Sequence, residues 1–228
     1  MPQLIEVQSI VADTQKMASL AMQSLEDSVH SLGDRDVDLA AKVIDRDEEI
    51  DRLNIAIDKK CLDALGSHLE GRTLRVVAAT YRLIVDLERI GDYSVSVSRV
   101  TRALANKPVS GTSIEIMRMA EIAGHMLKQS MDSYVSSDPV NLEQVFTDDQ
   151  EIDRLYGEVF HKGLEEIVHE PGTATNVIYL IIAARALERI GDHITDIAER
   201  VEYIKTGRLT ERSVPMHVPF GERDVTWE

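Results

Sequence analysis

Two stretches of the chain, Leu87–Asp92 and Leu187–Asp192, both read LERIGD, although they lie 100 residues apart. A second pair of stretches, Asp47–Leu53 (DEEIDRL) and Asp149–Leu155 (DQEIDRL), is identical at six of seven positions and lies 102 residues apart. Because two motifs recur in the same order at nearly the same spacing, the chain contains a tandem duplication. The repeated unit therefore decides the fold.

Apolar residues recur at spacings of three and four along almost the whole chain, which is the helical period. Glycine, proline and turn residues divide this pattern into six long segments, three in each copy. The sequence therefore predicts an all-α protein with two tandem three-helix bundle repeats and six long antiparallel helices. We expect the helices at about 4–32, 36–69, 72–106, 113–137, 139–170 and 173–206.

The loop Lys107–Gly111 separates the two copies, so we expect a first repeat over 1–107 and a second over 108–207. Asp138 and Pro139 are expected to begin the fifth helix, as N-cap and first helical residue. Gly207 is a candidate C-cap of the last helix. The remaining C-terminal tail, 208–228, shows no clear period and is expected to be extended or mobile.

Composition and charge exclude several classes of protein. With Gly 12 and Pro 6 in 228 residues, the chain has too few turn residues for an all-β sandwich or barrel. Its net charge of -15 and the lack of any basic run argue against nucleic acid as a partner. No stretch reaches the ~18 apolar residues of a membrane span, and the first residues do not resemble a signal peptide. Together with a single cysteine, Cys61, these features predict a cytoplasmic protein without direct membrane insertion.

Both repeated motifs contain an acid, three residues and then an aspartate, a spacing that places two carboxylates on one face of a helix. With 40 acids in the chain, chance alone gives about seven such pairs. These pairs differ because they are duplicated, and because apolar residues flank them at steps of four. An isolated carboxylate in an apolar stripe is costly, so it must be paired or bound to metal.

The two motifs of each copy lie at equal distances from the turn between them, which is expected at Glu70-Gly71 and at Glu170–Gly172. An antiparallel hairpin folded at these turns brings the motifs level with each other. Four carboxylates would then meet in each copy, and one divalent ion would not neutralise them, so we infer two or more metal ions per cluster. The candidate metal ligands are Asp47, Asp51, Glu88 and Asp92 in the first copy and Asp149, Asp153, Glu188 and Asp192 in the second.

Other residues of the motifs have supporting roles. Gly91 and Gly191 lie inside predicted helices, where glycine is unfavourable, so we expect close approach of another helix or of a metal cluster there. Arg89 and Arg189 are expected to pair with acids on the helix or to orient the carboxylates. Beyond the second copy of LERIGD, further acids extend the stripe at Asp196 and Glu199, where the first copy has Ser96 and Arg99. The two clusters therefore need not hold the same number of ions.

Two three-helix repeats, each with a D-x-x-x-D helix followed by an LERIGD helix, resemble the PhoU family of phosphate-transport regulators. The resemblance covers about residues 4–207. It implies an all-α protein that binds multinuclear metal clusters, usually of iron, through the eight acids named above. It also implies a role beside a phosphate-specific ABC transporter, where the family restrains uptake and signals phosphate sufficiency to a sensor histidine kinase. Ser96 departs from the family, which often has a polar amide there.

The leading hypothesis is therefore a metal-cluster-binding regulator of phosphate uptake and phosphate signalling. It would act as an adaptor to the ATPase subunit of the phosphate ABC transporter and to the sensor histidine kinase, with negative regulation when phosphate is sufficient. The clusters are expected to hold iron, with Mn, Mg or Zn as alternatives, because all-oxygen sites accept all four. The resemblance also implies a homodimer.

The sequence contains no nucleophile elbow, phosphate loop or dinucleotide-binding turn, so we expect no enzymatic activity. The alternative is a di-iron carboxylate helical-bundle enzyme of the ferritin type, which needs E-x-x-H motifs on two partner helices. Glu158–His161 and Glu166–His169 have this spacing, but both fall on the fifth predicted helix. A third possibility is a plain helical scaffold whose acids are only solvated.

Overall fold

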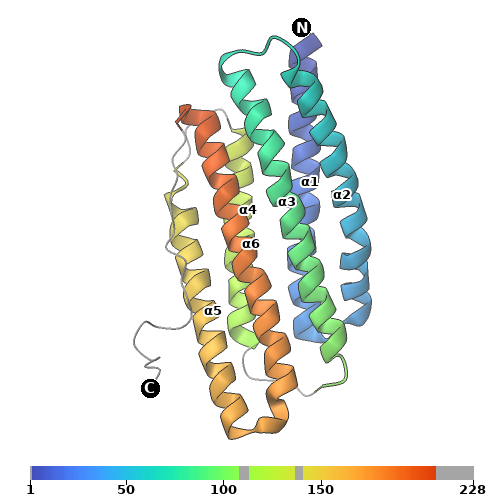
Figure 1. The fold of residues 1–228 in the computed structure, drawn as a ribbon, viewed down its shortest axis with the longest axis vertical. Helices are drawn as coiled ribbons and strands as arrows, with labels where there is room; N and C mark the ends of the chain where they lie inside the picture. The colour runs from blue at the N-terminus through green and yellow to red at the C-terminus, as the bar shows by residue number, and fades with distance from the viewer. Residues whose placement is uncertain (1, 108–112, 137–140, 209–228) are drawn as a thin grey trace, which may run out of the picture.

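A computed structural model describes residues 2–107, 113–136 and 141–208, and these residues form six long helices and one 3-10 turn, with no strand among them. The all-α prediction is confirmed. The turn Pro171–Thr173 precedes the last helix. The helices are α1 (Pro2–Asp34), α2 (Val37–Leu65), α3 (Gly71–Leu104), α4 (Ser113–Val135), α5 (Glu143–His169) and α6 (Ala174–Thr206), as labelled in Figure 1.

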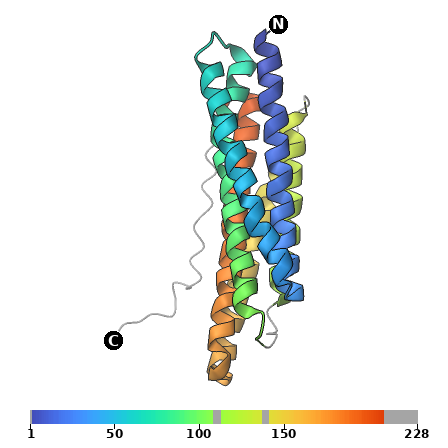
Figure 2. The same cartoon turned by 90° about the vertical axis from the view of Figure 1, so that its right-hand side faces the viewer.

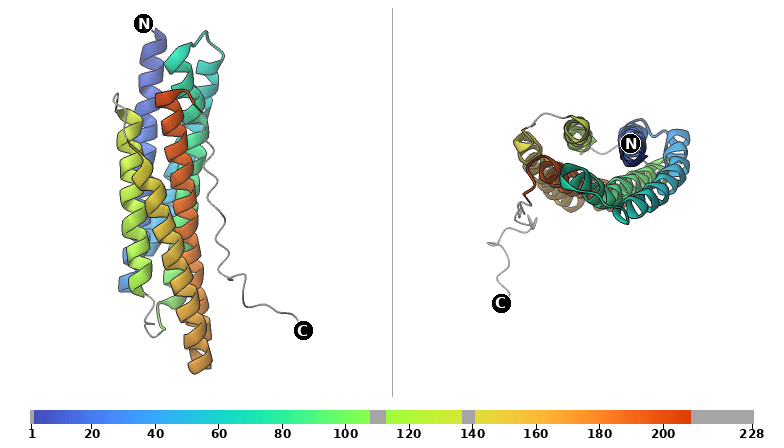
Figure 3. Two further views of the ribbon diagram at one scale, coloured as in Figure 1. Left: turned by 90° about the vertical axis from the view of Figure 1, so that its left-hand side faces the viewer. Right: turned by 90° about the horizontal axis from the view of Figure 1, so that it is seen from above.

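The two repeats, α1–α3 and α4–α6, lie side by side and meet mainly where α3 packs antiparallel against α6 (Figure 1). Seen from above, α2, α3, α6 and α5 form one curved layer, and α1 and α4 cover its concave side (Figure 3). The turn between α2 and α3 lies at the same end of the bundle as the N-terminus, and the turn between α5 and α6 lies at the opposite end (Figure 2). The helices that carry the candidate acids, α2, α3, α5 and α6, thus all belong to the curved layer.

Local sequence signals explain several helix ends. The side chain of Asp36 accepts a hydrogen bond of 2.8 Å from the Leu39 backbone N–H, and so caps α2. Gly207 ends α6 in the left-handed conformation, φ 72°, and its N–H donates to the carbonyl of Tyr203, which confirms the expected C-cap.

Two predicted helix boundaries are wrong. The second helix ends at Leu65 rather than Leu69, because the chain turns at Gly66, and Gly71 begins α3 with φ +55°. The fifth helix begins at Glu143, whose backbone N–H donates to the Asn141 side chain. The expected start at Asp138-Pro139, the boundary loop at 108–111 and the tail from 209 lie outside the described residues.

The core runs along the length of the bundle between the two layers. Buried aliphatic residues recur along α3 and α6, including Leu83, Leu87 and Ile190, and each contributes about 1.5–3 kcal/mol by leaving water. Cys61 is fully buried, and burial raises the pKa of its thiol to about 12, so this side chain is a small neutral core residue. None of the described helices has the length and apolar content needed to cross a membrane.

Candidate metal centres

The first set of acids lies between α2 and α3. Asp47 and Asp51 project from α2, and Glu88 and Asp92 project from α3. Burial, followed by the negative charges of the other three acids, raises the pKa of Asp47 to about 6. The two motifs of the first copy therefore face each other across the hairpin, as their spacing from the turn predicts.

The second set lies between α5 and α6 and is more deeply buried. Asp149 is only 1% exposed, and burial, followed by the charges of Asp153, Asp192 and Glu188, raises its pKa to about 8. Glu188 is 8% exposed, and its pKa is raised to about 7, first by burial and then by the charge of Asp192. The same four positions thus form a second set of facing carboxylates, in less polar surroundings.

Several carboxylate oxygens of the two sets are buried without a hydrogen-bond partner. They are Asp47 Oδ1 in the first set, and both oxygens of Asp149 and Oε2 of Glu188 in the second. A buried polar atom without a partner costs about 1–3 kcal/mol, and a charged one costs more. A hard cation bound by these oxygens would remove that cost, so the residues present fit a metal cluster.

Glycine brings the two helices of each hairpin close together at the acids. A Cβ atom at Gly91 would lie 2.9 Å from Asp47 Oδ1, and one at Gly191 would lie 2.6 Å from Asp149 Oδ1. Any larger residue at either position would push against the carboxylate. The expected close approach of another helix at these glycines is confirmed, and it presses an aspartate of α2 or α5 against the backbone of α3 or α6.

Arginines of the LERIGD motifs pair with the candidate ligands themselves. Arg89 lies 3.0 Å from Asp92 and 3.5 Å from Glu88, and Arg189 lies 3.0 Å from Asp192. In the second set Arg185 adds a 2.5 Å contact to Glu188. Arg189 lies 3.7 Å from the other oxygen of Glu188, so these guanidinium groups help to fix the orientation of the carboxylates.

The expectation that the acids lie on wholly apolar stripes is only partly correct. In the second copy, Val145 and Asp149 are both buried. In the first copy Val43 is buried, but Asp51 is exposed and Ile55 is 71% exposed. A step of four residues rotates about 40° around a helix, so the stripe on α2 turns from the core toward solvent.

Among the described residues, no three acids of either set bring ligand atoms within 4.8 Å of one another. In the part of the chain that the structure describes, one group of three side chains brings ligand atoms within 4.8 Å of one another: Asp86, His193 and Asp196. The sequence did not indicate this group, because Asp86 belongs to the first repeat and the other two to the second. The available signal was the difference between the two copies: His193 and Asp196 of the second copy correspond to Tyr93 and Ser96 of the first.

The histidine motifs considered for a di-iron site do not face a partner helix. Glu158 and His161, and Glu166 and His169, all lie on α5, and both histidines are exposed. Glu158 forms ion pairs with Arg154 and Lys162 on the same helix. The geometry of these motifs is that of a solvated helix face.

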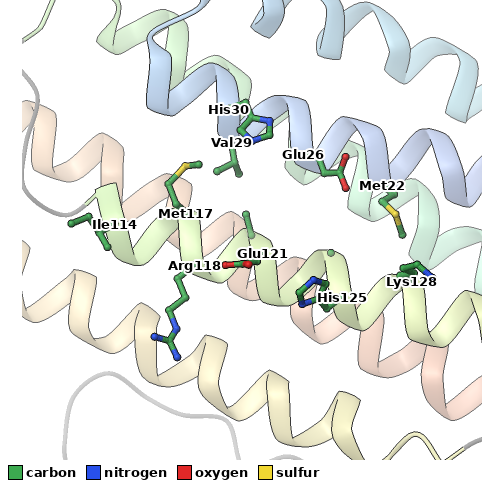
Figure 4. Close-up of a pocket in the computed structure, with 12 residues that line it drawn as sticks. Met22, Glu26, Val29, His30, Ile114, Met117, Arg118, Glu121, His125 and Lys128 are labelled. Carbon is green, nitrogen blue, oxygen red and sulfur yellow. The ribbon is translucent and has the colours of Figure 1, made fainter.

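A groove with a volume of about 750 Å³ lies away from the acids, between α1 and α4. Figure 4 shows Met22, Glu26 and His30 of α1 opposite Met117 and His125 of α4 across it. Its lining combines methionine, histidine and charged side chains, and it includes none of the eight acids.

The chain is similar to known proteins over most of its length. The PhoU domain matches the chain twice, over 14–101 and 116–201. The phosphate-specific transport system accessory protein PhoU homolog of Rhizobium meliloti (strain 1021) is 32% identical over 92% of this chain and 90% of that protein. The homolog of the same name from Synechocystis sp. is also 32% identical, over 86% of this chain and 88% of that protein.

Similarity extends to a solved structure. The crystal structure of PhoU from Pseudomonas aeruginosa matches with a TM-score of 0.86 at 28% identity, over 90% of this chain and 99% of that one. Each of the two matched domains contains one full set of four acids at the facing surfaces of its second and third helices. The chain belongs to the PhoU family.

Proposed function

We propose that this chain is an accessory protein that regulates phosphate transport and that it depends on metal for this role. Its two sets of carboxylates hold multinuclear clusters, of iron above all, with Mn, Mg or Zn as alternatives. In its metal-bound form it binds the ATPase subunit of the phosphate ABC transporter and the sensor histidine kinase, and it restrains uptake when phosphate is sufficient. It acts in the cytoplasm, as a homodimer and without catalytic turnover.

One observation carries the metal-binding part of this proposal. Both repeats contain buried carboxylate oxygens without a hydrogen-bond partner, at equivalent positions beside an equivalent glycine. Buried polar atoms in proteins are nearly always paired, so a bound cation is the partner that Asp47 Oδ1 and Asp149 Oδ1 call for. One divalent ion would not neutralise four carboxylates, so each set suits two or more ions.

The exposure of the acids supports the proposed binding of partner proteins. Asp51 is exposed, and Asp92, Asp153 and Asp192 are half-buried, so each set is accessible to solvent. Bound metal would supply positive charge and exchangeable water positions there, where a phosphoryl or carboxylate oxygen of a partner can bind. The names of the similar proteins point to phosphate transport as the setting.

The first experiment is co-purification with the two proposed partners. Replacement of Asp51, Asp92, Asp153 and Asp192 by alanine should weaken binding of the ATPase subunit and of the sensor kinase by at least about tenfold, if cluster ligands contribute as metal ligands do elsewhere. A matched control removes four exposed acids from α2 and α5: Asp45, Glu48, Glu143 and Glu165. The control should bind like the unmodified chain.

Partner binding that persists unchanged in the first variant and after chelation would contradict the proposal. Loss of binding after substitutions in the groove between α1 and α4 would then place the regulatory surface there. The alternative of a ferritin-type enzyme has its own test, which is oxygen consumption by the iron-loaded chain. We expect no consumption above that of free iron, since the two E-x-x-H motifs lie on one helix.

A further inference from the structure

A third group of metal-binding residue types lies where the two repeats meet, and it includes none of the eight acids. Asp86 projects from α3, and His193 and Asp196 project from α6. His193 Nδ1 lies 3.1 Å from Asp86 Oδ1, and one ligand atom from each residue lies within 4.8 Å of the other two. The ring of Tyr93 stacks on that of His193, with centroids 5.8 Å apart and planes 30° apart, and so orients the imidazole.

The internal duplication provides a control for this group within the molecule. The LERIGD motifs are 100 residues apart, and at this offset Asp86, His193 and Asp196 correspond to Ala186, Tyr93 and Ser96, respectively. These three residues also lie together, on the lining of a depression of about 320 Å³ between α3 and α6. One side of the junction therefore has a potential ligand at all three positions, and the equivalent side has neither an imidazole nor a carboxylate.

The group is accessible from solvent. Asp86 and Asp196 line a depression of about 270 Å³, together with Asp58, Arg82 and Arg200. Arg200 lowers the negative potential at Asp196, but no ion pair within 4 Å joins them among the described residues. A small cation can therefore reach the two carboxylates from this depression.

We propose that Asp86, His193 and Asp196 bind one divalent transition-metal ion and thereby join the two repeats. One imidazole and two carboxylates are a ligand set that suits Zn²⁺, Mn²⁺ or Fe²⁺ better than Mg²⁺ or Ca²⁺, which prefer oxygen alone. Ligand atoms of a tetrahedral zinc ion lie about 3.4 Å apart, given bonds of about 2.0–2.2 Å. His193 Nδ1 and Asp86 Oδ1 already lie 3.1 Å apart, and the ligand atom of Asp196 lies within 4.8 Å of both other ligand atoms.

The competing explanation is a structural contact in which protonated His193 pairs with Asp86 and no metal binds. This pair leaves Asp196 without a role, although Asp196 lies within reach of both other residues. It also predicts that zinc is absent from the junction at any concentration that fills the carboxylate sets.

The test is anomalous diffraction from crystals of the full chain soaked with Zn²⁺, recorded above the zinc absorption edge. We expect a peak between α3 and α6, about 2.0–2.1 Å from His193 Nδ1. The His193→Gln variant should lose this peak, and Ser96→Ala, at the equivalent position on the other side, should retain it. Asp86→Asn serves as a second variant if His193→Gln does not fold.

The outcomes separate this inference from the proposed function. Zinc at the carboxylate sets with none at the junction would overturn the inference and leave the proposed function standing. Zinc at the junction alone would support the inference and count against the two clusters. In solution, the imidazole ¹⁵N resonances of His193 should shift on addition of Zn²⁺, and Asp86→Asn, which leaves both sets intact, should reduce this shift. Unchanged resonances would overturn the inference as well.

Discussion

At the scale of single residues, the two glycines of the LERIGD motifs are the most informative positions. A helix normally loses about 1 kcal/mol when it contains glycine instead of alanine. Gly91 and Gly191 accept this cost because an aspartate from the neighbouring helix occupies the space where a Cβ atom would lie. The glycine thus fixes the position of Asp47 or Asp149, the most buried acid of each set.

Gly191→Ala should lower the free energy of unfolding of the metal-free chain, because its Cβ atom would lie 2.6 Å from Asp149 Oδ1. Overpacking of this kind costs about 1–3 kcal/mol, which exceeds or cancels the ~1 kcal/mol gained from helix propensity. Gly157→Ala is the matched control on α5, since nothing lies within 4 Å of its Cβ position. Denaturant unfolding should show this control to be more stable than the unmodified chain. If Gly191→Ala stabilised the chain as much as Gly157→Ala does, the close approach of Asp149 to Gly191 would be refuted.

The stability of the metal-free chain should fall as the pH rises. In the folded chain the pKa of Asp149 is about 8, that of Glu188 about 7 and that of Asp47 about 6, against about 4 in an unfolded chain. Between the two values the folded chain retains protons that the unfolded chain has released. The stabilisation is therefore complete in acid and is lost as the pH rises through the folded pKa values.

The measurement is the melting temperature of chelator-treated protein between about pH 5 and pH 8.5, in the range where these groups titrate. It should decrease across this interval, and Asp149→Asn should flatten the curve. A melting temperature that rises with pH would mean that cations of the protein neutralise these acids.

At the scale of elements, the helical period of the apolar residues was sufficient to predict all six helices and their order. Helix ends were predicted less well, because they depend on single hydrogen bonds. The fifth helix starts later than predicted, where the Asn141 side chain accepts a hydrogen bond from the Glu143 N–H. The second helix ends earlier than predicted, at the turn that contains Gly66. Ile55 is exposed for a geometric reason. Each four-residue step rotates around the helix, so a stripe that begins in the core at Val43 has turned toward solvent at Ile55.

The paired helices also determine which parts of the candidate site were predictable. Internal repetition identified all eight acids, because both members of each pair recur in sequence. The group of Asp86, His193 and Asp196 joins α3 to α6. Asp86 and His193 are 107 residues apart and belong to different repeats, so no motif within one repeat predicts their contact. Contacts between repeats depend on how the two units pack, which a motif within one unit does not encode.

Repulsion across the two hairpins gives a further prediction. In the metal-free chain, Asp92 and Asp192 add negative charge beside Asp47 and Asp149. The double variant Asp92→Asn, Asp192→Asn relieves part of this repulsion, so its metal-free form should melt at a higher temperature than the metal-free unmodified chain. For a chain of this length, 1 kcal/mol corresponds to about 2–4 °C. A lower melting temperature would show that Arg89 and Arg189, and not metal, hold these acids.

At the scale of the whole molecule, the duplication produces two similar centres with different surroundings. The second set is buried enough to shift the pKa of Asp149 to about 8, and the first opens toward solvent at Asp51. Both sets lie in the curved layer, and α1 and α4 cover its other side (Figure 3). The groove between α1 and α4 is lined by none of these carboxylates.

The central claim is that both sets bind metal clusters, and elemental analysis of protein purified without chelator tests it most directly. The unmodified chain should retain two or more ions per set, since one divalent ion does not neutralise four carboxylates. Asp47→Asn combined with Asp92→Asn should remove the metal bound by the first set. Asp149→Asn combined with Asp192→Asn should remove the metal bound by the second set, and all four substitutions together should remove both. A metal content that stays the same in the fourfold variant, or an unmodified chain that binds no metal when iron is supplied, would contradict the account.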